Sequence, residues 1–377
     1  MAPLAILLSA DPGGGHGTGG LLAAVYLLAG AAGGPVSARL ADRHGQRRVL
    51  AAGGVLSSTA FLTLAAGSEE TWWAAGAVAV AGAARPPLDA ALRARWGTGG
   101  TMPSAAHQRV ALALDSTTQE INYIVGPLLV TAITMAVSAP WALVATGAAG
   151  GLGTALFVSA AHPRVRGSSA GRENCLRAGR GRHPALRHLY LAMTCNGITL
   201  GALSPLAVQA AERLDAPGLT GGLPAALSCG AVAGGLLYGA AAGRAERDSR
   251  LTALSVCFAA GWLPLTAVDN PTVLLFAAAV PGLAMAPLLG AALATTSAHA
   301  PRGHMTQAHA LLVAGMDIGC AIGTAAADLT RSLLLLPAGA TAAALILTAS
   351  RRHPTPPRPD HPALAPAAMP DANGTSP

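Results

Sequence analysis

The sequence predicts an all-α membrane protein, a bundle of twelve helices in two six-helix halves. Three observations support this prediction. Of 377 residues, 52% are hydrophobic and only 11% are charged, whereas soluble domains run near 25% charged residues. The apolar residues recur in stretches of roughly 18 to 25, the length that crosses a ~30 Å hydrocarbon core as helix. An Arg- and Gly-rich segment near the middle separates six such stretches from six more.

The predicted spans follow one another with mostly short connections. The first apolar stretch, residues 1–10, would rise ~15 Å as helix, about half of a bilayer, so we expect an incomplete first helix. The later stretches are longer, and each stops at a charged or Pro/Gly-rich break. In chain order the expected spans are Met1 to Ala10, Gly19 to Ala38, Val49 to Gly67, Trp72 to Leu92, Val110 to Val137, Trp141 to Ala161, Leu189 to Ala211, Gly221 to Gly243, Leu251 to Val268, Thr272 to Ala298, Ala308 to Ala327 and Ser332 to Ala349.

Composition divides the chain into four parts. Residues 1–161 form the first predicted half, and residues 189–350 form the second. Between them, residues 162–188 are rich in Arg, Gly and Ser and are expected to form a cytoplasmic linker. The tail, residues 351–377, is rich in proline and is expected to be disordered.

The distribution of basic residues predicts an orientation. All 24 basic residues are arginines. With a cytoplasmic N-terminus, most of them fall in the even-numbered connections, the linker and the tail, as the positive-inside rule requires. Both termini are then cytoplasmic. Arginine without lysine, beside abundant alanine and glycine, is typical of a high-GC genome, so we expect a bacterial plasma membrane protein.

The sequence argues against several other functions. The arginines lie between apolar spans and not on one solvated face, so no nucleic-acid partner is expected. The five cysteines show no C-x-x-C spacing, and the histidines near residue 304 share no helical face, so no metal or other cofactor is expected. No nucleophile elbow and no ATP-binding loop are present, so we expect neither an enzyme nor an ATP-driven pump.

The connection after the second span carries the strongest local pattern. An acid beside a glycine turn and an arginine cluster can form an ion-pair latch between helix ends. This connection resembles the signature that members of the major facilitator superfamily carry between their second and third helices. Ala38 and Gln46 depart from the signature, and Arg48 completes the arginine cluster. The matching residues are Leu40, Asp42, Arg43, Gly45, Arg47 and Leu50.

The resemblance implies a fold and a mode of action. In that superfamily, two pseudo-symmetric six-helix halves bind a small molecule between them near the membrane midplane. Transport then proceeds by alternating access, driven by an ion gradient, in a protein that is a monomer by default. The resemblance therefore implies a small-molecule substrate, protons and the lipid bilayer as partners.

The fifth span carries a polar cluster at helical spacing. Asp115, Gln119, Asn122 and Gly126 form one stripe, and Glu120 lies on a neighbouring stripe. Ionisable groups inside a membrane usually face a cavity or a partner. Glu120 is therefore either a proton carrier or a hydrogen-bonded structural acid, and Asp115 lies nearer the cytoplasmic end.

Tyr123 and Pro127 continue the neighbouring stripe. Gly126–Pro127 resembles the core of the fifth-helix motif of drug/proton antiporters in the same superfamily, which implies export. A bend is expected there, because Pro127 lacks a backbone N–H and Gly126 permits close packing.

Two further spans carry charges. Arg85 and Asp89 flank two prolines in the fourth span, four residues apart. They form either a local pair on one helix face, or Asp89 joins the latch and Arg85 faces the cavity. In the eleventh span, Asp317 is either a second cavity acid or an acid paired with a neighbouring helix. Asn196 is a cavity candidate or a helix–helix hydrogen-bonding group.

These observations predict a secondary active transporter that works by alternating access, with proton-coupled export of a small molecule. The alternative is a protein of the same fold that does not transport: a sensor, a partner subunit or a degenerate transporter. The short first helix and Gln46 favour the alternative, whereas Asp42, Arg43 and the intramembrane acids favour transport.

Overall fold

The structure is a computed structural model that describes residues 1–10, 18–67, 71–88, 91–92, 105–160, 184–240, 247–299 and 305–352. Within these residues it contains twelve α-helices and no strand. The predicted linker and tail lie almost wholly outside the described residues. The helices are α1 (Ala2–Ala10), α2 (Thr18–His44), α3 (Gln46–Ala65), α4 (Thr71–Ala83), α6 (Ala105–Ala136), α7 (Ala139–Ser159), α8 (Pro184–Arg213), α9 (Leu219–Ala240), α10 (Arg247–Gly261), α11 (Pro271–His299), α12 (Met305–Thr330) and α13 (Leu335–Arg352), with a 3-10 turn, η3, at Leu263–Thr266.

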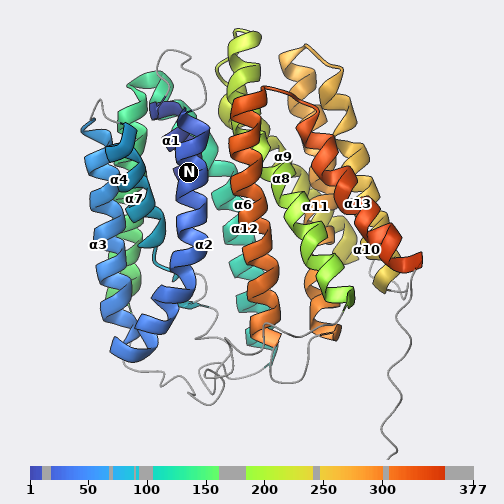
Figure 1. Ribbon diagram of the computed structural model, residues 1–377, viewed down its shortest axis with the longest axis horizontal. Helices are drawn as coiled ribbons and strands as arrows, with labels where there is room; N and C mark the ends of the chain where they lie inside the picture. The colour runs from blue at the N-terminus through green and yellow to red at the C-terminus, as the bar shows by residue number, and fades with distance from the viewer. Residues whose placement is uncertain are drawn as a thin grey trace, which may run out of the picture.

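The twelve helices coincide in order with the twelve predicted spans. Seven helices in the described part of the chain are long and apolar enough to cross a membrane, and four shorter apolar stretches accompany them. The short first span is confirmed as the nine-residue helix α1. Its N-terminus lies at mid-height in the bundle (Figure 1).

The fourth span departs from the prediction of one helix over residues 72–92. Helix α4 ends at Ala83, and residues 85–87 are not helical. Pro86 and Pro87 explain the break, because proline lacks an N–H donor and disfavours helical backbone in the residue before it. The expectation that Arg85 and Asp89 share a helix face is therefore wrong. Asp89 itself lies outside the described residues.

The connection between the second and third spans is shorter than predicted. Helices α2 and α3 are separated by Gly45 alone, which adopts a φ of +92°. A positive φ of this kind is readily available only to glycine. The signature residues before and after it therefore lie on the ends of two helices, and not in a loop.

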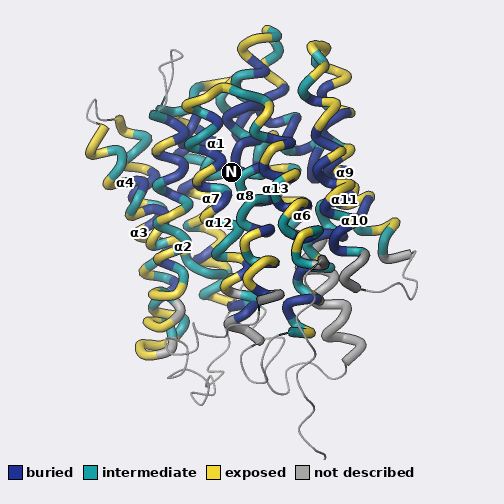
Figure 2. The backbone as a smooth tube through the Cα atoms, turned by 45° about the vertical axis from the view of Figure 1, so that its right-hand side comes forward, coloured by how far each residue is buried: buried dark blue, intermediate teal, exposed yellow. Residues whose placement is uncertain are grey.

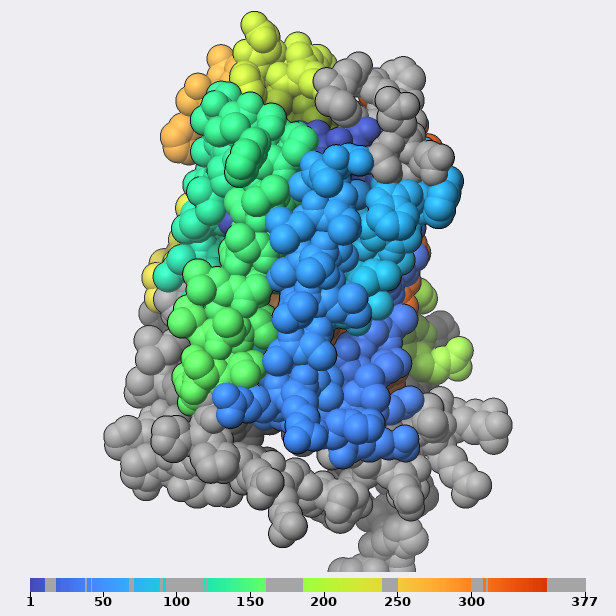
Figure 3. All heavy atoms as spheres, turned by 90° about the vertical axis from the view of Figure 1, so that its left-hand side faces the viewer, coloured from blue at the N-terminus to red at the C-terminus, as the bar shows by residue number. Residues whose placement is uncertain are grey.

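The two halves repeat the same helix pairs (Figure 1). In the first half α2 packs on α4, and in the second half the corresponding helices α9 and α11 pack together. The pair α3 and α7 corresponds in the same way to α10 and α13. Figure 3 shows α3 and α7 side by side on one face of the first half. This repetition confirms a bundle of two pseudo-symmetric halves.

Two helix pairs make most of the contact between the halves, and α1 also meets α8. The second helix of each half packs against the fifth helix of the other: α2 against α12, and α6 against α9. Each half also has its own buried core, with Phe61 and Leu143 in the first and Phe258 and Trp262 in the second. The boundary between the halves is therefore formed chiefly by α2, α6, α9 and α12.

The surface of the bundle is apolar, as a lipid environment requires. Large hydrophobic side chains such as Leu236, Phe276 and Leu345 are well exposed, and Figure 2 shows exposed stretches along the helices at the periphery. Small residues mediate the close helix contacts instead. Gly319 and Gly323 on α12 pack directly against the backbone of α8 at Thr194 and Ile198.

Candidate functional site

Arg85 is the charged residue around which a site between the halves is built. The break after α4 releases it from the helix, and its side chain is exposed to open space. Its guanidinium donates a hydrogen bond to the hydroxyl of Tyr26 on α2. It also interacts electrostatically with Asp317 on α12 and with Tyr123 on α6. Three helices and one helix break thus converge on a single cation.

The site joins the two halves through opposite charges. Arg85 belongs to the first half, and Asp317, which is half-buried, belongs to the second. Both lie within the membrane-spanning bundle, where an ionisable group is costly unless it meets a partner or a polar cavity. Each charge therefore lowers the free-energy cost of keeping the other ionised inside the membrane. Asp317 therefore has a cation from the other half beside it, and its role as a cavity acid stays a prediction.

Asn196 lies near the level of Asp317 on the adjacent helix. The next residue along α8, Gly197, packs against the backbone of Met316 and Gly319 on α12. The Asn196 side chain is only 3% exposed, and neither atom of its amide has a hydrogen-bond partner among the described residues. Buried amides are normally hydrogen-bonded. Asn196 is thus a polar group whose hydrogen-bonding capacity is unused in this state.

The polar stripe of α6, a candidate lining for the substrate site, stays a prediction. Asn122 and Tyr123 are exposed, and Gln119 is half-buried. Asp115 and Glu120 lie on the same helix, but their side chains are outside the described set. The expected proton-carrying role of Glu120 therefore stays a prediction.

Gly126 and Pro127 take part in close helix packing. A Cβ atom on Gly126 would lie 2.9 Å from the side chain of Met1, at the start of α1. The carbonyl of Pro127 faces Gly221 on α9, where an added Cβ would lie 2.6 Å from it. Helix α6 continues through Pro127 as far as Ala136. The dipeptide therefore holds α6 against helices of both halves.

The signature residues lie at one end of the bundle, which we call the Gly45 end. Leu40, Arg43, Arg47 and Arg48 are exposed around the turn at Gly45. The backbone of Asp42 lies in the last turns of α2, whereas its side chain is outside the described set, as is Asp89. The ion-pair latch predicted here stays a prediction.

The opposite end, which we call the Gly20 end, is where contacts join the halves. The backbone N–H of Gly20 on α2 donates a hydrogen bond of 2.8 Å to Asp328 on α12. On the other side of the bundle, Gly221 near the start of α9 meets Pro127 and Thr131 of α6. Figure 1 shows α2 and α12 close together at the Gly20 end and diverging toward the Gly45 end. Both contacts therefore join the halves at the Gly20 end.

Sequence reasoning did not single out Tyr26. It is one of only four tyrosines in the chain, and it is the lone hydroxyl group in an apolar run, residues 20–30. A buried tyrosine hydroxyl normally requires a hydrogen-bond partner. A single tyrosine in an apolar run therefore indicates a polar partner on another segment. The partner, Arg85, is identified only by the packing of α2 beside the end of α4.

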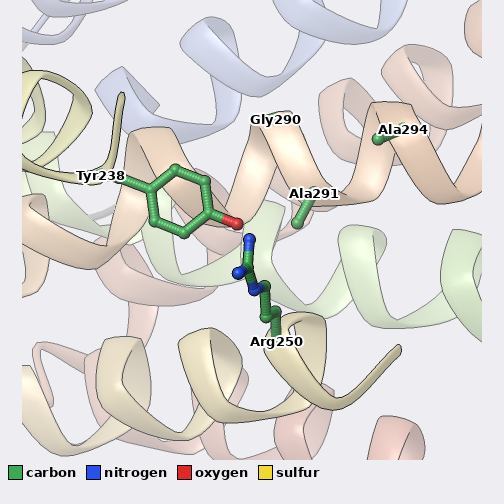
Figure 4. A pocket seen from close by; sticks show the side chains of 5 residues that line it. All are labelled: Tyr238, Arg250, Gly290, Ala291 and Ala294. Carbon is green, nitrogen blue, oxygen red and sulfur yellow. The ribbon is translucent and has the colours of Figure 1, made fainter. Parts of the chain in front are cut away.

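A pocket of about 200 Å³ lies between α9, α10 and α11. Figure 4 shows Arg250 beside Tyr238, whose ring centroid is 5.9 Å from the guanidinium carbon. The remaining lining is small and apolar: Gly290, Ala291 and Ala294. It shares no residue with the Arg85 site and lies within one half. Among the described residues, no group of three metal-ligating side chains is found in either place.

A twelve-helix bundle with repeated halves, and with a charged site between them, defines the class of secondary membrane transporters. The chain belongs to the major facilitator superfamily, whose sequence profile matches residues 1–324. The family expected from the signature around Gly45 is thereby confirmed.

Solved structures of transporters share the fold. The nucleoside transporter NupG aligns at 13% identity and a TM-score of 0.69, covering 93% of this chain and 95% of that one. The peptide transporter POT in complex with sulfate aligns at 14% identity and a TM-score of 0.67, covering 93% and 91%. The human organic anion transporter MFSD10 (TETRAN) aligns at 15% identity and a TM-score of 0.59, covering 88% and 82%. No curated protein matches the sequence.

Proposed function

We propose that this protein is a proton-coupled secondary transporter that exports a small molecule across a bacterial plasma membrane by alternating access. One observation carries the proposal: Arg85 and Asp317, of opposite charge and from opposite halves, interact in the space between those halves. The strength of an interaction in this position changes when a substrate binds and when the halves move relative to each other.

The pair offers a physical route to coupling. A proton on Asp317 removes its charge and weakens its attraction to Arg85, which keeps its hydrogen bond to Tyr26. Arg85 is then available to polar groups of a substrate. Because removing one partner of an intramembrane pair is costly, the substrate has to replace the lost interactions. Proton binding and substrate binding are thereby linked.

Membrane orientation and direction of transport follow from the sequence. The arginines around Gly45 favour a cytoplasmic position for that end, which places the Gly20 end outside. Both termini are then cytoplasmic. The resemblance of Gly126–Pro127 to the antiporter motif favours export. A monomer is sufficient, because the site is complete within one chain.

Other predicted residues have supporting roles in this proposal. Asp42, with Arg43 and Arg47, forms the latch that closes the Gly45 end when the halves rock, and Asp89 is its candidate partner from the fourth span. Glu120 is a second candidate proton carrier, and Asp115 lies nearer the cytoplasmic entrance. The fold neighbours carry nucleosides, peptides or organic anions according to their names, which supports a small organic substrate without selecting one.

The test begins with a panel of small organic acids, amines and zwitterions, screened by thermal stabilisation of the purified full-length chain. A ligand that binds only the folded state raises the unfolding temperature. Stabilising compounds are then tested in proteoliposomes for counterflow, which needs no gradient, and for accumulation driven by an imposed pH difference.

The two transport assays separate the parts of the proposal. Counterflow together with pH-driven accumulation supports a proton-coupled transporter. Counterflow without pH-driven accumulation contradicts proton coupling but retains transport. Binding without either flux contradicts transport and supports the alternative, a sensor or partner subunit of the same fold.

A further inference from the structure

The carboxylate of Asp328 binds the start of helix α2 across the boundary between the halves. Its Oδ2 atom accepts a hydrogen bond of 2.8 Å from the backbone N–H of Gly20. Gly20 lies in the first turn of α2, and Asp328 lies in the last turn of α12. Gly20 is buried and Asp328 is half-buried, so this bond is largely screened from water.

The start of a helix is a favourable place for a carboxylate. The first backbone N–H groups of a helix have no partner inside it, and the aligned peptide dipoles place partial positive charge there. A hydrogen bond to an ionised acceptor is also stronger than one between neutral groups. Asp328 therefore caps α2 with a group supplied by the other half of the protein.

The fit depends on the absence of a side chain at position 20. A Cβ atom built on Gly20 would overlap the Cβ atom of Asp328 and would lie 2.6 Å from its Oδ2 atom. Any larger residue at position 20 has to push α12 away. The hydrogen bond between the two helices thus depends on their close approach at Gly20.

The second half holds this carboxylate in place. The residue before Asp328, Ala327, is fully buried, and its carbonyl accepts a hydrogen bond of 3.2 Å from Gln209 on α8. The same carbonyl also accepts the N–H of Arg331, at the point where α12 ends with a φ of +52°. The end of α12 is therefore fixed to its own half before it meets α2.

We propose that Asp328 and Gly20 form the polar gate that keeps the Gly20 end closed. This inference rests on the proposed alternating access, in which the two halves must separate at that end. Another contact at this end, between α6 and α9 at Gly221, involves the backbone of Pro127 and the side chain of Thr131. In the gate a charged group has to lose its hydrogen bond when the end opens. Removing this charge therefore shifts the protein toward the state open at the Gly20 end.

The shift can be measured as a distance between spin labels in the full-length protein in lipid nanodiscs. Labels are attached to cysteines introduced at Val137 and Leu263, after the native cysteines are replaced by serine. Both positions are exposed, and they lie at the Gly20 end of opposite halves. Double electron–electron resonance then reports the populations of the closed and open states.

We expect Asp328→Ala to raise the ratio of open to closed protein by roughly 10-fold or more, as loss of a hydrogen bond to a charged group implies. Asp328→Asn should raise it less, because asparagine keeps an acceptor but loses the charge. Gly20→Ala should act in the same direction as Asp328→Ala. Asp269→Asn is the matched control, since Asp269 is an 82% exposed acid that pairs with Arg213 within the second half. Its distances should equal those of the parent protein.

Unchanged distance populations in both Asp328 variants, with folding intact by size-exclusion chromatography, overturn the gate. If Gly20→Ala alone fails to fold, the two Asp328 variants still decide the question. If the populations shift but the protein shows no counterflow, the gate is supported and the proposed transport function is contradicted. Failure of the gate and failure of the transport function are therefore distinguishable.

Discussion

Arg85 donates a hydrogen bond to the hydroxyl of Tyr26, and this bond fixes the cation of the candidate site against helix α2. Tyr26 is buried, whereas the Arg85 side chain is exposed to the space between the halves. The tyrosine therefore anchors one side of the guanidinium and leaves its other donors free to face Asp317 or a substrate. A guanidinium has five N–H donors, so one anchoring bond leaves most of them available.

Replacing Tyr26 by phenylalanine tests this anchoring role. The change removes one hydroxyl and leaves the ring, which packs beside Phe61. We expect kcat/KM for the substrate found by counterflow to fall roughly 10-fold, since a hydrogen bond to a charged group is worth ~1.5–3 kcal/mol. Tyr238→Phe, in the separate pocket, is the matched control and should leave transport unchanged. Equal effects of the two changes would remove Tyr26 from the site.

Asp317→Asn tests proton coupling. Asparagine keeps the size and polarity of the side chain but cannot lose a proton, so the charge of Arg85 is no longer matched. We expect counterflow to stay within about 3-fold of the parent rate and accumulation driven by a pH difference to disappear. Asp269→Asn serves as the control. Full pH-driven accumulation by Asp317→Asn would assign the coupling role elsewhere, with Glu120 as the next residue to test.

Asp42→Asn tests the latch proposed for the Gly45 end. The change removes the acid beside the turn at Gly45 and leaves the surrounding arginines. We expect transport to be lost although the protein remains folded and inserted, because the Gly45 end can no longer be held closed. Proteoliposome flux and size-exclusion chromatography measure these two properties. A variant with full flux would show that the arginine cluster serves only to orient the chain.

Gly319→Ala tests the packing of α12 on α8. A Cβ atom at this position would overlap the backbone carbonyl of Thr194, so the helices have to separate. We expect a loss of about 1–3 kcal/mol in the free energy of unfolding, as is usual for overpacking. Gly150→Ala on α7 is the control, because no atom lies within 4 Å of its added Cβ. It should be neutral or slightly stabilising, and both are measured by denaturation in detergent.

Much of the fold was predictable from local sequence. The number of helices, their order and most of their bounds follow from hydropathy, because each helix has to satisfy its own backbone and match the thickness of the bilayer. The break at Pro86 and Pro87 was underestimated, although proline chemistry explains it.

The candidate site was predictable only in part. Arg85, Asp317 and Asn196 were selected from the sequence because charged and amide groups are rare in apolar spans. Which of them converge was not predictable, because convergence depends on the rotation and packing of helices far apart in the chain. Tyr26 and Asp328 were not selected as site residues for the same reason.

The sequence by itself determined a polytopic helical protein, its two halves and its family, because hydropathy, span length and the signature around Gly45 are local properties. Only the tertiary structure decided that Arg85 meets Tyr26 and Asp317, and that Asp328 caps α2 at Gly20. These contacts join residues from different helices, and two of them join different halves. Their geometry is set by how the helices pack, which no single stretch of sequence encodes.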